Sequence, residues 1–305
     1  MRILPSHGRP IYTLAYSPDG RMLAAGDGEG MDLWNVDAGV AVEVKPRNVR
    51  TQRSRAMGFS LPIRCARFSN DGEWLVVGLH NWPVHLWSIG DQDFDVKRGP
   101  TFGTALEGLA VAPNGRTLAV ACDNLVRQCT IPDLANVKTS VHTACNTIFA
   151  LSYSPDGHAL AIGAGTSGRS GLVLLQWSTG TSTDELPGHR GPVLSVGFSP
   201  NSHLLASGSA DHTIRLWDVR RAELLGVLQG HTDVVHCIVF AADGRTLISA
   251  SWDGTVKLWD VSSQRERTTF TWHRGSVHAV AIAPDGMTAA TAGQDGAIVI
   301  WDVDC

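Results

Sequence analysis

The 305-residue chain carries 25 lysines and arginines against 29 aspartates and glutamates, a net charge of -4. This balance excludes the general attraction to nucleic acid or anionic membranes that a strongly basic chain has. Apolar residues make up 43% of the chain and 32 residues are glycine, as expected for many short strands joined by tight turns. The sequence shows neither an apolar run of roughly 18 residues nor a secretory signal. We therefore expect a cytoplasmic chain, monomeric on its own, that contacts no membrane.

The segment 188–219 contains a pattern of residues that returns twice more. Its histidine and its tryptophan each recur every 42 residues, at His189, His231 and His273 and at Trp217, Trp259 and Trp301. A period of roughly 40 to 45 residues, built from short β-rich runs, is typical of propeller-type repeat folds. A single domain over residues 1–305 is therefore expected, although length alone favours about two.

Laid over the whole chain, the unit occurs seven times, each time as alternating apolar runs separated by turns. The first turn usually ends in Asp-Gly or Asn-Gly, where glycine adopts a positive φ without steric cost. These turns are residues 17–20, 69–72, 112–115, 154–157, 199–202, 241–244 and 283–286. Each copy is therefore predicted to open with a β-hairpin.

Paired motifs recur in register with these turns. A Gly-His pair opens copies five and six at Gly188 and Gly230, and a Trp-Asp pair closes copies five, six and seven. In copy seven, Trp272 replaces the glycine before His273. With these motifs the chain resembles the WD-repeat β-propeller family over nearly its whole length.

The resemblance implies an all-β fold, a seven-bladed β-propeller of four-stranded antiparallel blades. The family closes its ring with an N-terminal strand that completes the last blade, and the short run Arg2-Ile3-Leu4, with two apolar residues, suits this role. The implied blades are about 7–44, 59–97, 101–140, 144–186, 188–228, 230–271 and 272–305, the last completed by a strand at about 1–6.

A histidine, a hydroxyl and an aspartate recur together and suggest a catalytic triad. An active site is needed once, whereas this set occurs in three copies. The resemblance implies instead a buried hydrogen-bond chain from Asp through His and hydroxyl to Trp, so we expect no enzyme. The three sets are His189, Ser207, Asp211 and Trp217; His231, Ser249, Asp253 and Trp259; and His273, Thr291, Asp295 and Trp301.

The six cysteines lack the paired two-residue spacing of a zinc site. They are Cys65, Cys122, Cys129, Cys145, Cys237 and Cys305. We expect packed, reduced thiols, no metal and no cofactor.

Two segments depart from the 42-residue period. Residues 45–60 carry five basic side chains and no acidic one, which indicates either a solvated loop or a site for an anionic partner. The basic residues are Lys45, Arg47, Arg50, Arg53 and Arg55. Residues 163–171 are rich in glycine but lack the ending of a phosphate-binding loop, so a long hairpin loop with Arg169 near its tip is expected.

The resemblance also implies a binding face around the mouth of the central channel, where peptide-binding members of the family hold their ligands. The corresponding positions here are Tyr12, Arg64, His80, Glu107, Phe149, Leu194, His236, Trp252, His278 and Gln294. Trp252 lies in a turn beside Asp253, where packing does not demand an aromatic ring, and large rings are enriched at binding hot spots.

Three functions are compatible with these features. The first is a non-catalytic platform that binds a protein or peptide at the channel mouth. The second is an anion or nucleic-acid binder that uses residues 45–55, whose affinity would fall with salt. The third is an enzyme that uses Glu107 with His236 or His278 as an acid/base pair, which requires these groups to meet on one substrate. The sequence favours the first.

Overall fold

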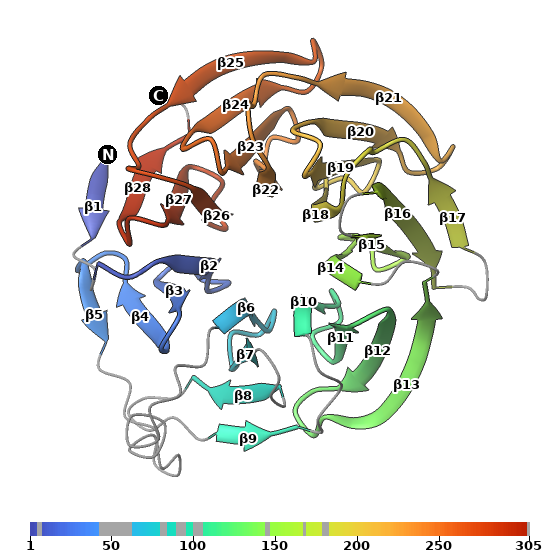
Figure 1. Ribbon diagram of the computed structural model, residues 1–305. Helices are drawn as coiled ribbons and strands as arrows, with labels where there is room; N and C mark the ends of the chain where they lie inside the picture. Colours follow the sequence, from blue (N-terminus) through green and yellow to red (C-terminus); the bar gives the residue numbers. More distant parts are fainter. Residues whose placement is uncertain are drawn as a thin grey trace.

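The computed structural model describes residues 1–4, 8–42, 63–79, 84–89, 96–99, 106–143, 147–166, 169–178 and 183–303. These residues form seven four-stranded antiparallel sheets. The sheets stand side by side around a central opening, with the first strand of each sheet innermost (Figure 1). This arrangement confirms the predicted seven-bladed propeller.

In blades one to six the strands follow one another outward in chain order, and in blade seven the N-terminal strand takes the outermost place. Blade one holds β2 (Ile11–Tyr16), β3 (Met22–Asp27), β4 (Met31–Asn35) and β5 (Val40–Val42). Blade two holds β6 (Ile63–Phe68), β7 (Trp74–Leu79), β8 (His85–Ser88) and β9 (Val96–Arg98). Blade three holds β10 (Leu106–Val111), β11 (Thr117–Cys122), β12 (Leu125–Thr130) and β13 (Ala135–His142).

The same order continues in the second half of the chain. Blade four holds β14 (Thr147–Tyr153), β15 (Ala159–Thr166), β16 (Arg169–Trp177) and β17 (Thr183–Leu186). Blade five holds β18 (Val193–Phe198), β19 (Leu204–Ser209), β20 (Ile214–Asp218) and β21 (Glu223–Leu228). Blade six holds β22 (Val235–Phe240), β23 (Thr246–Ser251), β24 (Val256–Asp260) and β25 (Arg265–Phe270). Blade seven holds β26 (Val277–Ile282), β27 (Thr288–Gly293), β28 (Ile298–Asp302) and β1 (Arg2–Leu4).

The N-terminal strand closes the ring, as predicted. In β1, Arg2 pairs with Ile300 and Leu4 with Ile298 of β28. Leu4 is buried in a core cluster that blades seven and one share. The Arg2 Nη1 atom donates a hydrogen bond of 2.7 Å to the carbonyl of Val36 in blade one. The strand thus completes one blade and ties it to the next.

The first hairpin turn of each blade has the predicted conformation. In blade one, the Gly20 amide donates to the Ser17 carbonyl at 2.9 Å, and the Met22 amide donates to the Ser17 hydroxyl at 2.9 Å. The six glycines that end such turns have φ values between +64° and +74°. Blade five has Ser202 there, with φ at +62°. The turn sequence therefore sets the hairpin in each copy.

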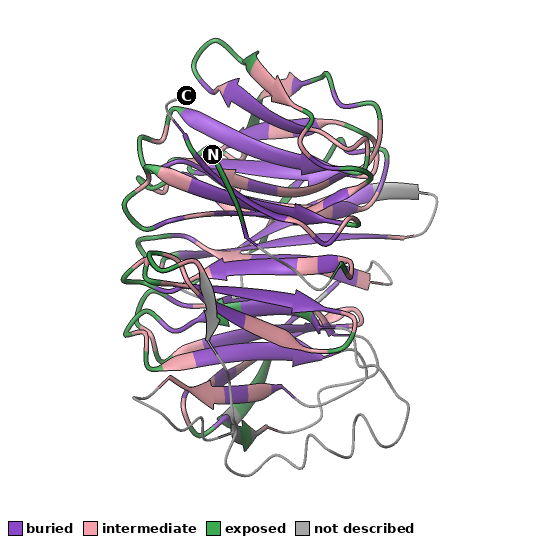
Figure 2. Ribbon diagram, turned by 90° about the vertical axis from the view of Figure 1, so that its left-hand side faces the viewer, coloured by how far each residue is buried: buried purple, intermediate pink, exposed green. Residues whose placement is uncertain are grey.

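The core consists of apolar strand residues packed between neighbouring blades, and the exposed residues lie at the turns on both faces of the ring and along the outermost strands (Figure 2). Cys65, Cys122 and Cys129 are buried, free thiols in one of these clusters. Burial raises the pKa of Cys65 to about 12 and that of Cys129 to about 11, so both stay protonated. No helix long and apolar enough to span a membrane occurs in the described part of the chain.

The glycine-rich segment 163–171 differs from the prediction. Most of it continues the β15–β16 ladder, which extends as far as the pair Thr166 and Arg169, so the expected long loop is wrong. Its glycines allow a close approach to blade five. A Cβ atom on Gly165 would lie 2.6 Å from the Pro192 Cα atom, and one on Gly171 would lie 2.1 Å from the Gly191 carbonyl oxygen. The glycines thus serve packing between blades.

Candidate binding site at the channel mouth

All seven innermost strands contain a β-bulge at the same place. In blade one, Ile11 pairs with Asp27 and Thr13 pairs with Gly26, so Tyr12 is left without a partner in the ladder. A bulge inserts one extra residue and re-aims its side chain. The inserted residues are Tyr12, Arg64, Glu107, Phe149, Leu194, His236 and His278. They are the inner-strand positions that the sequence singled out.

The seven bulged residues all line one central cavity of about 580 Å³. Trp252, from the turn after β23, lines the same cavity and is 41% exposed. The structure thus brings together eight of the ten residues predicted for the channel mouth.

Five of these side chains form a continuous group, here called the mouth cluster: Tyr12, Arg64, His236, Trp252 and His278. The Trp252 ring stacks on His236 with centroids 5.8 Å apart, and His278 lies 5.5 Å from His236. Tyr12 meets His278 edge-on at 5.4 Å. The guanidinium of Arg64 lies 5.6 Å from the centroid of the Tyr12 ring, a cation–π contact. The cluster therefore spans blades six, seven, one and two.

Both histidines of the mouth cluster are neutral at neutral pH. Burial lowers the pKa of His278 to about 4, and His236 and the Arg64 guanidinium act in the same direction. Burial likewise lowers the pKa of His236, although a hydrogen bond from its Nδ1 atom to the His278 carbonyl, 2.6 Å long, opposes that effect. The positive charge of the cluster at neutral pH therefore resides on Arg64.

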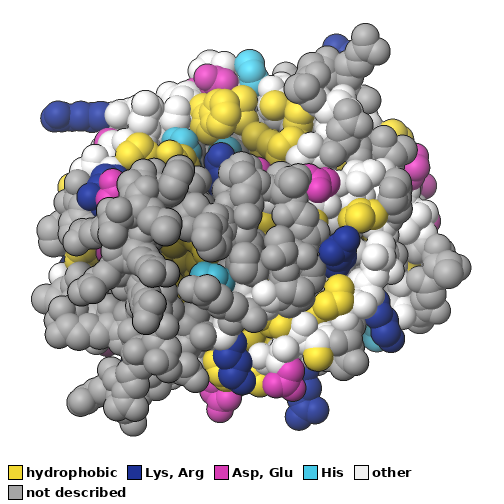
Figure 3. All heavy atoms as spheres, turned by 60° about the horizontal axis from the view of Figure 1, so that its bottom comes forward, with side chains coloured by type: hydrophobic (Ala, Val, Ile, Leu, Met, Phe, Trp, Pro, Cys, Tyr) yellow, Lys and Arg dark blue, Asp and Glu magenta, His cyan; other side chains and the backbone are white. Residues whose placement is uncertain are grey.

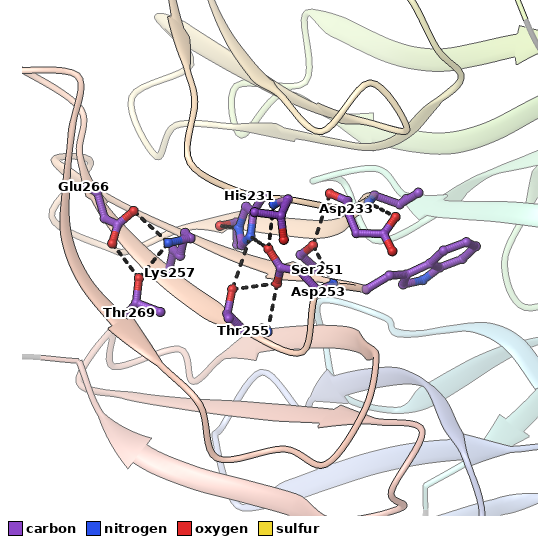
Figure 4. A network of polar contacts seen from close by, with 12 residues as sticks. His231, Asp233, Ser251, Asp253, Thr255, Lys257, Glu266 and Thr269 are labelled. Atoms are coloured by element: carbon purple, nitrogen blue, oxygen red, sulfur yellow. Dashed lines mark hydrogen bonds and ion pairs between the residues drawn. The ribbon is translucent and has the colours of Figure 1, made fainter.

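The turn that carries Trp252 is held by hydrogen bonds, and its neighbours Asp233, Ser251 and Asp253 take part in the network drawn in Figure 4. The Trp252 amide donates to the Val234 carbonyl at 3.0 Å. The next residue, Asp253, donates its amide to the Ser251 hydroxyl at 3.1 Å, and that hydroxyl donates to the Asp233 carbonyl at 3.2 Å. The tryptophan backbone is thus fixed from both sides, which lowers the entropy lost when the ring binds a partner.

The side of the cavity opposite the mouth cluster is mostly apolar and carries one carboxylate. Phe149 from β14 and Leu194 from β18 supply apolar surface. Glu107 belongs to β10, which lies across the central opening from β22 and β26, the strands of His236 and His278 (Figure 1). This separation disfavours an acid/base pair made of Glu107 and either histidine.

The remaining candidate residues do not join the group. Gln294 is exposed and absent from the described lining of the cavity, because its side chain turns to its own blade and its Oε1 atom accepts a hydrogen bond from the Ser276 amide at 3.4 Å. Gln294 thus does not line the cavity with the other candidates, and its role in partner binding stays a prediction. His80 and the basic residues of segment 45–55 lie outside the described residues.

The repeated hydrogen-bond chain is complete in blades five and six. In blade six, His231 Nδ1 donates to Asp253 at 2.8 Å, the Ser249 hydroxyl donates to His231 Nε2 at 2.7 Å, and Trp259 Nε1 donates to that hydroxyl at 2.8 Å. Blade five has the same links between Asp211, His189, Ser207 and Trp217. Burial alone would raise the pKa of Asp253, but hydrogen bonds from His231 and Thr255 lower it overall.

In blade seven the hydrogen-bond chain lacks its last hydrogen bond, the one from the tryptophan. His273 lies 3.1 Å from Asp295 and 3.0 Å from the Thr291 hydroxyl, but the buried Trp301 Nε1 atom has no hydrogen-bond partner among the described residues. The Trp301 ring instead packs against Trp272, 5.3 Å away, which occupies the place of the motif glycine. The expectation of a third complete set is therefore corrected. No cluster of three or more His, Cys, Asp or Glu side chains suited to a metal ion occurs within the described ranges.

A closed ring of repeated four-stranded blades defines the chain as a repeat-built β-propeller. The model of the family described as WD domain, G-beta repeat matches residues 1–32, 180–218, 222–260 and 264–302. Together with the seven blades and the buried His-Asp pairs, these matches show that the chain belongs to the WD-repeat β-propeller family.

Several curated proteins are similar to parts of the chain. Periodic tryptophan protein 2 of Arabidopsis thaliana is 30% identical over 167 residues, which cover 54% of this chain and 18% of that protein. The WD repeat-containing protein 26 homolog of the same species is 25% identical over 261 residues, 72% of this chain and 42% of the relative. WD repeat and HMG-box DNA-binding protein 1 of Xenopus laevis is 30% identical over 155 residues, 50% of this chain and 13% of the relative. The chain spans less than half the length of each of these relatives.

Proposed function

We propose that the chain is a non-catalytic binding scaffold that holds a peptide or a loop of a partner protein at the channel mouth. The observation that carries this proposal is the β-bulge shared by all seven inner strands, which presents seven side chains of six types to one cavity. A uniform scaffold with variable side chains at one opening suits specific recognition. Trp252, half-exposed and fixed by its turn, is the principal anchor.

Burial of the His-Ser-Asp sets supports binding rather than catalysis. His189 and Ser207 are buried, and each already has its partners within the hydrogen-bond chain. A nucleophile must reach its substrate, and this hydroxyl is enclosed between blades. The repeated sets therefore act as structural supports.

The charges of the described residues on one face favour a compact peptide site over a nucleic-acid tract there, while the basic segment 45–55 lies outside the described residues. On the face shown in Figure 3, the Lys and Arg side chains of the described residues lie apart from one another, with acidic side chains between them. Nucleic-acid binding needs basic residues gathered along a stripe or patch. We therefore base the proposal on the mouth cluster.

An affinity capture from cell extract tests the proposed function. The bait is the wild-type chain, and the test variant carries Trp252→Ala with Arg64→Ala. A matched control carries Met287→Ala with Arg265→Ala, which also removes one exposed large apolar side chain and one exposed arginine, but away from the cavity. We expect the control to retain the proteins captured by the wild type and the test variant to lose them. Retention of every captured protein by a folded test variant would show that the channel mouth is not the binding site.

A further inference from the structure

The chemistry of the mouth cluster restricts the peptide that it can bind. The cluster carries one permanent charge, on the exposed guanidinium of Arg64. Apart from the His-Asp pairs, the ion pairs among the described residues join Arg9 with Asp27 and Glu29, and Lys257 with Glu266. None of them involves Arg64, so its charge stays available to a ligand.

The aromatic rings of the cluster do not form a site for a cation. Tyr12 and Trp252 could each attract a lysine or arginine through their ring faces. However, Arg64 already lies over the Tyr12 ring, and its field reaches both histidines, since it lowers the pKa of His236 and of His278. A second cation entering the mouth would be repelled by this charge, whereas an anion would be attracted.

A buried polar atom beside Arg64 also lacks a partner. The His278 Nε2 atom is enclosed and has no hydrogen-bond partner among the described residues, although His278 lines the cavity. The groups that face this imidazole are His236 from β22, Arg64 from β6, Tyr12 from β2 and Trp252 from the turn after β23. None of these groups is an anion, and the Glu107 carboxylate that also lines the cavity belongs to β10, across the central opening from β26. A ligand carboxylate beside His278 would therefore stabilise the protonated imidazole.

We infer that the channel mouth selects peptides with an acidic side chain, whose carboxylate pairs with Arg64 while Trp252 packs against the adjoining peptide residue. This inference rests on the proposed peptide-binding function and adds the charge of the ligand. A bidentate pair between a guanidinium and a carboxylate gives both attraction and orientation. Phe149 and Leu194 supply apolar surface on the opposite wall for a neighbouring apolar residue of the peptide.

A carboxylate bound beside His278 raises the pKa of this imidazole and so promotes its protonation. The free protein holds this imidazole neutral, and the bound anion favours its charged form. The affinity for acidic peptides therefore rises as the pH falls from neutrality toward the pKa of His278, as long as the peptide carboxylate stays ionised. A peptide with glutamine at the same position lacks this dependence.

A positional-scanning library of acetylated, amidated octapeptides tests the inference. One position is fixed in turn as Asp or Glu, as Asn or Gln, or as Lys or Arg, and retention on the immobilised full chain is measured. We expect acidic pools to be retained about tenfold more than amide pools, the advantage of a charge-assisted hydrogen bond. Arg64→Gln should abolish that preference, and Arg64→Lys should keep part of it. Pools with a free C-terminus show whether a terminal carboxylate serves equally.

The outcomes separate this inference from the proposed function. If acidic and amide pools are retained equally and Trp252→Ala abolishes both, the mouth binds peptides but the charge selection is wrong. If no pool is retained above a blank surface, the peptide-binding function itself is wrong. For the pH effect, His278→Gln should remove the gain in affinity at low pH. An unchanged pH profile in that variant would overturn the assigned proton uptake.

Discussion

The Asp253 carboxylate supports the hydrogen-bond chain of blade six. It accepts hydrogen bonds from His231, from the Thr232 amide and from Thr255. Asp253→Ala leaves the buried His231 Nδ1 atom with only the Thr255 hydroxyl, 3.3 Å away, and removes the acceptor of the Thr232 amide. We expect a loss of about 1 to 3 kcal/mol in the free energy of unfolding. Denaturant unfolding measures it. Asp285→Ala, at an exposed turn, is the matched control, with an expected change of about 0.5 kcal/mol or less. Equal effects of the two changes would contradict the structural role.

The His278 imidazole makes stability depend on pH. Its pKa of about 4 in the folded chain is below the ordinary histidine value of about 6.5. Between these values the unfolded chain binds a proton that the folded chain does not, so stability falls as the pH falls through this window. We expect the melting temperature to drop less between about pH 7 and about pH 5 in His278→Gln than in the wild type. Identical slopes would show that this imidazole titrates normally. The lowered pKa values of Asp211 and Asp253 act only at more acidic pH.

At the scale of the element, the short strand β1 closes the ring through one side chain. Leu4 is 1% exposed in the core, whereas its neighbour Ile3 is 59% exposed on the opposite side of the strand. We expect Leu4→Ala to cost about 2 to 5 kcal/mol and Ile3→Ala about 0.5 kcal/mol or less, as measured by chemical denaturation. Deletion of residues 1–6 should lower the melting temperature further, since it also exposes the edge of β28. An unchanged melt after the deletion would contradict closure by β1.

The inner strands show which features a sequence can and cannot predict. Alternation and Asp-Gly turns predicted the hairpins, because both are local properties of the chain. The bulges were not predicted, because the extra residue appears only when the partner strand sets the register. The segment 163–171 was misjudged for a similar reason. Its glycines are required by close contacts with Gly191 and Pro192 of the next blade, and no local sequence pattern reveals such contacts.

At the scale of the whole molecule, the 42-residue period sufficed to predict the ring, because each repeat must bury its faces against its neighbours. The candidate site was predicted only as a set of positions. Tyr12, Arg64, His236, Trp252 and His278 form one series of contacts from blade six through blades seven and one to blade two. These contacts depend on the curvature of the closed ring, which no single repeat encodes. Gln294 occupies the turn position equivalent to that of Trp252, but its side chain accepts a hydrogen bond within its own blade and does not line the cavity.

Local stability should vary around this ring. Blades five and six have complete hydrogen-bond chains, whereas the buried Nε1 atoms of Trp34, Trp87 and Trp301 have no partner among the described residues. We expect the backbone amides of β19 and β23 to exchange with solvent at least about tenfold more slowly than those of β3 and β7. The latter are the equivalent strands of blades one and two. Leu23, Leu75, Leu205 and Leu247 are equally buried in these strands, so burial alone cannot cause the difference.

Hydrogen exchange followed by mass spectrometry on the full chain measures this difference. Asp253→Ala should accelerate exchange in β23 of blade six and leave β19 of blade five nearly unchanged, because each hydrogen-bond chain lies within its own blade. Uniform exchange over all blades would contradict the assignment of rigidity to the hydrogen-bond chains. Acceleration spread evenly over the ring would instead indicate that the propeller opens as one cooperative unit, with its stability shared among the interfaces between blades.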